Sequence, residues 1–177
     1  DKAIELCRLF NCSLDNLFRD DMVICNEVYT NLRVETVPAF RYIKYAVISS
    51  DPERDAIDRV FSIARSYGVE KPRIIGWDFP KLSQEQINVF NMHGYEAAWV
   101  LPDGIVPPDI EIHEQADHRY AAIHIENPFE NPFVTIPNAY KTLMEYMSVN
   151  NLEHTETDVI PCFETNEESM DVYIACR

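Results

Sequence analysis

Apolar and polar positions in the first half of the 177-residue chain predict one strand, one helix and two more strands. An apolar run indicates a strand over 41–48, and a helix over about 50–68 follows, with apolar residues three and four apart on one side. Two further runs, over 73–79 and 95–101, predict strands separated by a polar segment. The first half therefore has the order strand–helix–strand–strand.

The second half of the chain repeats this order after the dipeptide Pro107-Pro108. The pattern predicts a strand over 119–125 and a helix that starts near Pro137 and ends around residue 150. Two strands joined by a polar turn, over 160–176, then close the chain. Because the order of elements is the same in both halves, the pattern indicates an internal duplication.

The duplication predicts an α+β fold with repeats over about 38–106 and 109–177. Two pseudo-symmetric strand–helix–strand–strand units, paired about a twofold axis, form an antiparallel sheet with both helices packed on it. This arrangement has a central cleft at the seam, and small molecules bind in clefts of that sort. Asp78 in the first repeat corresponds to Glu164 in the second, because each directly follows an aromatic residue at a strand end.

Residues 1–18 predict two short helices in front of the duplicated part. The first apolar stripe ends near residue 12, and Ser13 is placed to cap the second helix. Two short helices cannot bury their own apolar faces, so we expect this piece to be the tail of a domain whose beginning is absent. The following segment, 22–37, is consistent with a linker or with an edge strand.

Composition and charge narrow the classes of function. With 46% hydrophobic residues the chain can bury a core, and its 30 acidic against 15 basic residues disfavour nucleic acid binding by these residues. The net charge of −15 would attract cations over anions. The 5 Cys form no Cys-x-x-Cys pair and fit a reducing cytosol, so we expect a cytoplasmic protein. No apolar run approaches the ~18 residues of a spanning helix, so no membrane partner is expected.

Motifs for metal binding, cofactor binding or nucleophilic catalysis are not found in the sequence. His113, His118 and His124 have neither metalloprotease nor zinc-finger spacing, so we expect no metal site and no cofactor. The sequence also has no recognisable Ser/His/Asp order, glycine-rich phosphate loop or Cys/His dyad. A standard nucleophilic hydrolase therefore has no sequence support.

Glu164, at the end of the first strand of the final hairpin, is the first candidate for function. Burial of an unpaired carboxylate is costly, so Glu164 is solvated at the turn, paired with a base or placed to meet a ligand. A solvated strand-end glutamate is the common case. The correspondence with Asp78 favours the functional interpretation.

Aromatic residues on or beside the predicted strands are the second candidate: Trp77, Phe79, Tyr95, Trp99, Tyr120, Phe163 and Tyr173. Strand alternation sends about half of them to a core, and core packing is the default interpretation for any single one. Taken together with one or two acids, they suit a lipophilic cation held by charge and cation–π contacts.

The polar segment 83–95, rich in amides, is the third candidate. Its default interpretation is a loop with a helical turn that links two strands. It could instead cover the cleft as a lid.

These motifs, in this order, resemble the GyrI-like effector-binding domain of several bacterial multidrug-sensing transcription regulators. The matching stretches are 76–80 in the first half, and 120–125, the helix 139–146 and the hairpin 161–174 in the second. The likeness covers about Val37 to Cys176. Each stretch is loose by itself, and their order is more specific.

The resemblance implies a ligand cleft centred on Glu164, because in that family the matching carboxylate meets the positive charge of bound drugs. It also implies Tyr173 and Trp99 as aromatic walls, with Tyr120 next. Trp77 and Asp78 are added as site residues from the internal symmetry alone.

The stretch 4–18 separately looks like the last helices of a Cro/CI-type helix-turn-helix domain. This implies that 1–21 is the remnant of a DNA-binding domain, 22–37 a linker and 38–177 the effector-binding domain. The recognition helix is missing from the sequence, so DNA is expected as a partner only through that missing part. Family analogues are commonly dimeric, so a homodimer is also expected.

These expectations describe the ligand-sensing domain of a bacterial-type transcription regulator. It would bind lipophilic or cationic small molecules in an acidic, aromatic-lined cleft. A branch of the same superfamily hydrolyses reactive cyclopropane-bearing compounds, so the alternative is a hydrolase with Glu164 as general base. A partner-binding protein whose cleft takes no ligand is a third interpretation.

Overall fold

The computed structural model describes residues 2, 4, 28–78, 82–89, 91–165, 167 and 169–177. The helices predicted over 1–18 lie outside these residues, apart from positions 2 and 4, so that prediction stays untested. The chain divides into two compact units. We call Ala39–Ala116 with Glu164–Asn166 the α4 unit, and Asp117–Phe163 with Glu167–Arg177 and the chain up to Pro38 the α6 unit, after the long helix in each.

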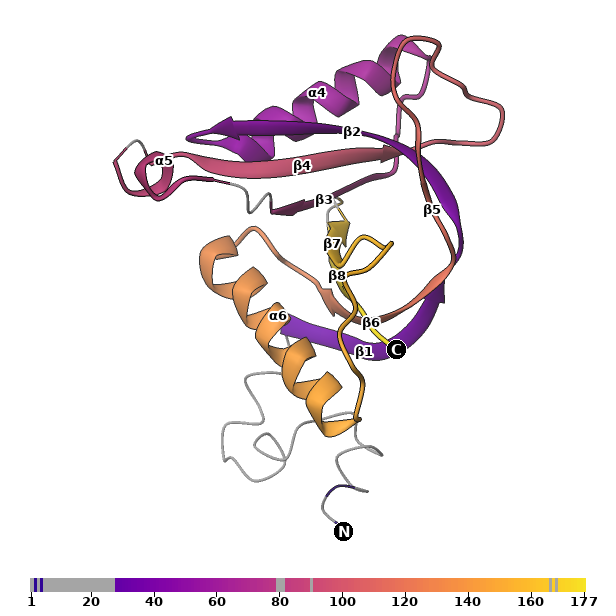
Figure 1. Cartoon of the computed structure of the whole chain (residues 1–177). Helices are drawn as coiled ribbons and strands as arrows, with labels where there is room; N and C mark the ends of the chain where they lie inside the picture. The colour runs from indigo at the N-terminus through magenta and orange to yellow at the C-terminus, as the bar shows by residue number, and fades with distance from the viewer. Residues whose placement is uncertain are drawn as a thin grey trace. The chain divides into compact units, whose positions relative to one another are not determined.

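The described residues form an α+β fold of strands and three helices, and every strand pairing is antiparallel. The elements run in the order β1 (Tyr29–Val37), β2 (Phe40–Ser49), α4 (Pro52–Ser66), β3 (Ile74–Asp78), α5 (Gln84–Asn88), β4 (His93–Val100), β5 (His113–Gln115), β6 (His118–Ile125), α6 (Pro132–Val149), β7 (Cys162–Thr165) and β8 (Met170–Ala175). Figure 1 labels each of them. The α+β class predicted from the sequence is confirmed.

In the α4 unit, β4 pairs with both β3 and β2, and β2 pairs with β5. Helix α4 begins with Pro52 in its first turn, where the missing N–H costs nothing, and Gly68 follows its end with a φ of 78°. Its buried residues recur every fourth position, at Ala56, Val60 and Ala64, so they form one apolar stripe. This stripe packs on one face of the sheet, in the cluster that also holds Ile43, Tyr95, Ala97 and Trp99.

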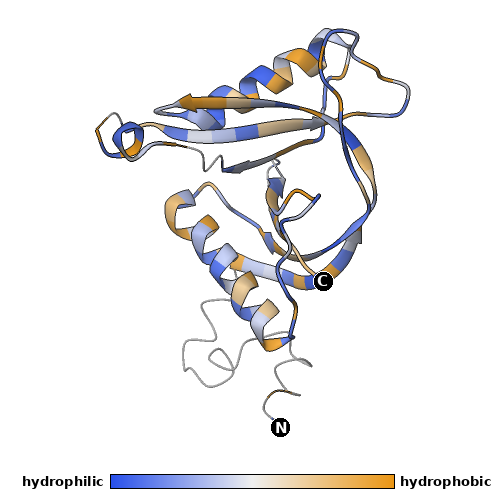
Figure 2. Ribbon diagram, in the orientation of Figure 1, coloured by the Kyte–Doolittle hydropathy of each residue, from blue (hydrophilic) through white to orange (hydrophobic). Residues whose placement is uncertain are grey.

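In the α6 unit, β6 pairs with β1 on one side and with β8 on the other. Ala139, Leu143 and Met147 of α6 are buried in a cluster with alternate residues of β6 and β8, including Ile123 and Val172. Both long helices carry hydrophobic and hydrophilic positions side by side (Figure 2), as expected for helices that cover one face of a sheet. Some apolar residues of α6 face solvent, and Phe133 is 92% exposed.

The two units share the order strand–helix–strand–strand, and in each the first strand of that order pairs with the last, β2 with β4 and β6 with β8. The duplication itself stays a prediction. The edge-strand alternative for 22–37 holds from Tyr29 onward, where β1 pairs with β6, although its register shifts between Thr30 and Arg33.

The start of the second long helix was predicted wrongly. Helix α6 begins at Pro132, five residues before Pro137, which lies inside the helix. The N–H groups of Val134 and Thr135 donate to the carbonyl of Asn131, at 3.0 and 2.9 Å, and these bonds form the first turn. Asn131-Pro132 therefore starts the helix, with proline at a position where it loses no hydrogen bond.

Two further elements complete the description. The polar segment 83–95 contains the short helix α5, in which the Gln86 N–H donates to Ser83 Oγ at 3.2 Å and the Ser83 N–H donates to Gln86 Oε1 at 2.8 Å. Strand β5 was not predicted. Within the described ranges no helix is long and apolar enough to span a membrane.

Candidate functional site

Glu164 lies in β7, directly opposite Gly76 of β3, and is only 9% exposed. Directly opposed residues of an antiparallel pair project to the same face of the sheet. The carboxylate therefore lies on the face of β3 to which Gly76 would direct a side chain. It is buried rather than solvated at a turn, in contrast to the common case considered for the sequence.

The Tyr95 hydroxyl lies close enough to the Glu164 carboxylate for a hydrogen bond between them to be one of the causes that raise the pKa of Tyr95. Tyr95 in β4 lies opposite Asp78 of β3, so Tyr95, Asp78, Gly76 and Glu164 all belong to one face of three neighbouring strands. Burial raises the pKa of the Tyr95 hydroxyl well above its usual value, and the negative charges of Glu164, Glu53 and Asp78 raise it further. Tyr95 therefore remains a neutral donor at physiological pH.

Glu53 and Asp78 add two more carboxylates near this pair. Glu53, in the first turn of α4, has a pKa raised by burial and by the charges of Asp78 and Asp51. Asp78 is the most exposed of the three acids, yet partial burial raises its pKa, while His93 lowers it. We call Glu53, Asp78, Tyr95 and Glu164 the Tyr95–Glu164 cluster. Its negative potential and its fixed donor suit a group that carries positive charge.

The opposite face of the same strands holds a second buried acid, Glu96, which the sequence did not point out. Trp77 Nε1 donates to Glu96 at 2.7 Å, and Lys44 Nζ lies 3.1 and 3.4 Å from its two oxygens. Tyr42 packs edge-on against Trp77 with 6.4 Å between ring centroids. Glu96 therefore has its charge and its hydrogen bonds satisfied within the protein.

Trp99 lies in the core beneath α4. It is fully buried, with its ring 6.0 Å from that of Tyr67. Its indole N–H has no hydrogen-bond partner among the described residues. This position is typical of a packing residue.

Tyr120 and Tyr173 belong to the α6 unit, where they pack around Phe163. The ring of Tyr173 stacks on Phe163 at 4.5 Å, and Tyr120 meets Phe163 edge-on at 5.3 Å. The Tyr120 hydroxyl donates to the Ile160 carbonyl at 2.9 Å, and Tyr120 is fully buried. Phe163 precedes Glu164 in β7, so their side chains project to opposite faces of that strand.

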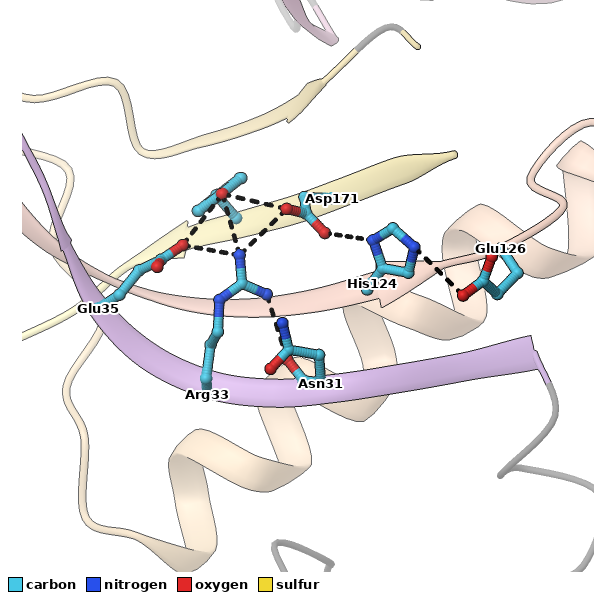
Figure 3. A network of polar contacts seen from close by, with 7 residues as sticks. Asn31, Arg33, Glu35, His124, Glu126 and Asp171 are labelled. Atoms are coloured by element: carbon cyan, nitrogen blue, oxygen red, sulfur yellow. Dashed lines mark hydrogen bonds and ion pairs between the residues drawn. The ribbon is translucent and has the colours of Figure 1, made fainter. Parts of the chain in front are cut away.

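A chain of polar contacts crosses β1, β6 and β8 of the α6 unit (Figure 3). Arg33 Nη2 lies 2.7 Å from Glu35, 3.0 Å from Asp171 and 3.1 Å from the Tyr173 hydroxyl. Asp171 also contacts His124 Nδ1 at 2.7 Å. Burial, followed by the charges of Asp171 and Glu35, raises the pKa of Tyr173. This network ties β1, β6 and β8 together by side chains.

The six predicted site residues thus fall into four groups. Glu164 and Asp78 share the Tyr95–Glu164 cluster, whereas Trp77 is bonded to Glu96 on the other face. Trp99 is in the α4 core, and Tyr120 and Tyr173 pack on Phe163. Sequence reasoning missed Glu53 and the role of Tyr95. One signal was available, because a glycine inside an apolar strand, Gly76, often marks a close approach by another group.

Among the described residues, no group of three or more His, Cys, Asp or Glu side chains has the geometry of a metal site.

Comparison with known proteins identifies the class of fold. No family model matches the chain, and no curated protein matches it in sequence. Solved structures do match. Among them are EcmrR in complex with DNA, the EcmrR C-terminal domain and a hydrolase, and together they fit the GyrI-like fold that the sequence resembles.

Three solved structures illustrate this likeness. A complex of the regulator EcmrR with DNA is 14% identical, with a TM-score of 0.61, and the match covers 100% of this chain and 66% of that one. The EcmrR C-terminal domain is 12% identical, with a TM-score of 0.53, covering 83% of this chain and 97% of that one. A hydrolase from Listeria innocua is 11% identical, with a TM-score of 0.52, covering 90% and 98%. At these identities the likeness shows the fold.

Proposed function

We propose that this chain is the effector-binding part of a transcription regulator and that Glu164 anchors the positive charge of a small organic ligand. The observation that carries the proposal is the burial of the Glu164 carboxylate beside Tyr95, with Glu53 and Asp78 nearby. A buried carboxylate, beside a tyrosine that also experiences the negative charges of Glu53 and Asp78, is stabilised when a cation binds.

The ligand would be an amine, a quaternary ammonium or another organic cation with apolar substituents. Acids and a tyrosine on one face select for positive charge, and the adjacent α4 core supplies apolar surface. Glu164 and Asp78 are the predicted residues that enter this proposal directly. Trp99 and Tyr120 are fully buried, so a ligand would reach them only after rearrangement of their surroundings.

Regulation of DNA binding is proposed from the fold class and from the resemblance of residues 4–18 to the end of a helix-turn-helix domain. EcmrR, 66% of whose chain is covered by the match, has been solved in complex with DNA, which supports this proposal. The net charge of −15 means that any DNA contact would be made by a separate basic part of the protein.

The test replaces Glu164 by glutamine and measures binding of the cationic dye ethidium by fluorescence. Glu164→Gln removes the charge, preserves the shape and is expected to weaken binding about tenfold or more. Glu70→Gln, at a side chain that is 80% exposed, removes the same charge elsewhere and is expected to leave affinity unchanged. Equal affinity of wild type and Glu164→Gln would refute the proposal.

A hydrolase is the second candidate, and the Tyr95–Glu164 hydrogen bond is the observation that favours it. Glu164 could remove a proton from water as the water attacks a strained ring carbon, while Tyr95 holds the carboxylate in position. The ring C–C bond then breaks, and the carbon that keeps its electron pair takes up the proton from Glu164. A hydrolase of Listeria innocua has the same fold. Product formation from a cyclopropane-bearing electrophile, lost in Glu164→Gln, would support this activity, and saturable binding without conversion would exclude it for that compound.

A further inference from the structure

Gly76 occupies the middle of β3, between Ile75 and Trp77, where a side chain would normally add packing. A glycine inside a strand weakens it, because glycine loses more conformational entropy on folding and buries no side chain. Positive φ angles, which would require glycine, are found at Gly68 and Gly104 but not at Gly76. The backbone conformation therefore gives no reason for glycine at this position.

Space is the reason that the structure does provide. A Cβ atom added to Gly76 would lie 2.2 Å from the Tyr95 hydroxyl oxygen and 2.5 Å from Cε1 and Cζ of the same ring. Side-chain atoms do not approach each other so closely, and Tyr95 is only 5% exposed. Any other residue at position 76 would displace the Tyr95 ring.

The strand register explains why the ring takes this path. Tyr95 is in β4 and Glu164 is in β7, and β3 lies between them with Gly76 directly opposite Glu164. Two strand spacings are about 9.6 Å, so the Tyr95 side chain must lie across β3 for its hydroxyl to meet Glu164. The position that it crosses is Gly76.

We propose that Gly76 is a positioning residue of the Glu164 site. Because Gly76 has no side chain, the Tyr95 ring can lie over it and reach Glu164. The consequence for ligands rests on the proposed function. The Tyr95 hydroxyl holds the carboxylate in one orientation before a cation arrives, so less conformational entropy is lost when the cation binds. Gly76 then sets affinity without touching the ligand.

The first measurement reads Tyr95 itself. Proteins with isotope-labelled tyrosine rings are titrated by NMR, and Tyr95→Phe identifies the Tyr95 signal by its disappearance. In the wild type this signal is expected to titrate far above the ordinary tyrosine range. In Gly76→Ala it should titrate at lower pH, because the displaced hydroxyl is less buried and no longer lies beside the acids. A signal that titrates identically in both proteins would overturn the proposal.

The second measurement uses ethidium affinity in a double-mutant cycle. Gly76→Ala and Tyr95→Phe are each expected to weaken binding about threefold to tenfold, the range for one lost hydrogen bond. If Gly76 acts through Tyr95, Gly76→Ala has no further effect on affinity in the Tyr95→Leu background, which has neither the hydroxyl nor the ring atoms that the methyl group would meet. Additive losses would overturn the proposal.

A compensating variant at position 95 serves as the control for effects of Gly76→Ala on folding. Leucine at position 95 is shorter than tyrosine and leaves room for a methyl group at position 76. Gly76→Ala is therefore expected to lower the melting temperature in the wild type but much less in Tyr95→Leu. An equal drop in melting temperature in both backgrounds would show that the methyl group does not meet Tyr95, and this would refute the proposal. The comparison decides the question even if Gly76→Ala alone fails to fold.

These experiments distinguish a failure of the positioning role from a failure of the proposed function on which it rests. If Glu164→Gln leaves ethidium affinity unchanged, the proposed function is wrong. The NMR titration and the melting experiments then still decide whether Gly76 positions Tyr95. If Glu164→Gln weakens binding but Gly76→Ala does not, the function stands and the positioning role is wrong.

Discussion

Removal of the Lys44 ammonium tests how much the buried charge of Glu96 depends on its partner. The Glu96 side chain is 11% exposed, and Lys44 Nζ lies 3.1 Å from one of its oxygens. Lys44→Met keeps a long unbranched apolar chain of similar volume and deletes only the charge. The hydrogen bond from Trp77 Nε1 to Glu96, at 2.7 Å, would remain.

The magnitude follows from burial. Breaking a buried ion pair by removing one partner costs about 3–5 kcal/mol, because the other charge is left uncompensated. Lys44 is 34% exposed, so water reaches this pair and screens the remaining charge. We therefore expect Lys44→Met to lower the free energy of unfolding by about 1.5–3 kcal/mol, below the fully buried range.

Urea denaturation of a four-protein cycle measures this effect. Glu96→Gln retains an oxygen that accepts from Trp77 and frees the partly exposed Lys44 to turn towards water, so we expect it to cost less than Lys44→Met. In the double variant no buried charge is left alone, and most of the Lys44→Met loss should disappear. A loss under about 0.5 kcal/mol for Lys44→Met, or additive losses in the double variant, would refute this reasoning.

Two further predictions concern stability. Leu143→Ala should lower the free energy of unfolding by about 2–5 kcal/mol, because Leu143 is fully buried on the sheet-facing side of α6. Its neighbour Met144 is 51% exposed, so Met144→Ala should change the free energy of unfolding by less than about 0.5 kcal/mol. Similar losses for both variants in urea denaturation would contradict the assigned helix face. Tyr95 and Tyr173 have raised pKa values in the folded protein, so the stability they contribute is fully present below the unfolded tyrosine pKa of about 10 and is lost as pH rises through the folded values. Wild type should therefore lose stability above about pH 10 in denaturation series, and Tyr95→Phe and Tyr173→Phe should each lose less; unchanged pH profiles in both variants would count against the burial of these hydroxyls.

The parts of the fold that follow from hydrophobic periodicity were predictable from the sequence. The strand predicted over 119–125 is β6 (His118–Ile125), and the helix predicted over about 50–68 contains α4 (Pro52–Ser66). Elements set by local turn chemistry were not. The start of α6 was misplaced because Pro137 looks like a first-turn proline, although Pro132 has that position and the helix tolerates the second one inside it.

The candidate site was predictable only in part, because strand register decides which side chains meet. The correspondence of Asp78 with Glu164 came from comparing strand ends, and both acids do lie near Tyr95. Glu53 belongs to a helix and Tyr95 to a strand far along the chain, so periodicity alone could not join them. The separation of Trp77 from Asp78 follows from strand alternation once β3 is paired with β4.

The placement of the tryptophans makes one half of the protein optically distinct. Both tryptophans of the chain, Trp77 and Trp99, belong to the α4 unit, so indole fluorescence follows the melting of that unit alone. Circular dichroism, in contrast, sums the helices and strands of both units. Coincident melting curves from the two methods would show one cooperative transition, and separated curves would show that the α4 and α6 units unfold independently. The chain thus contains its own reporter for cooperativity, without any added label.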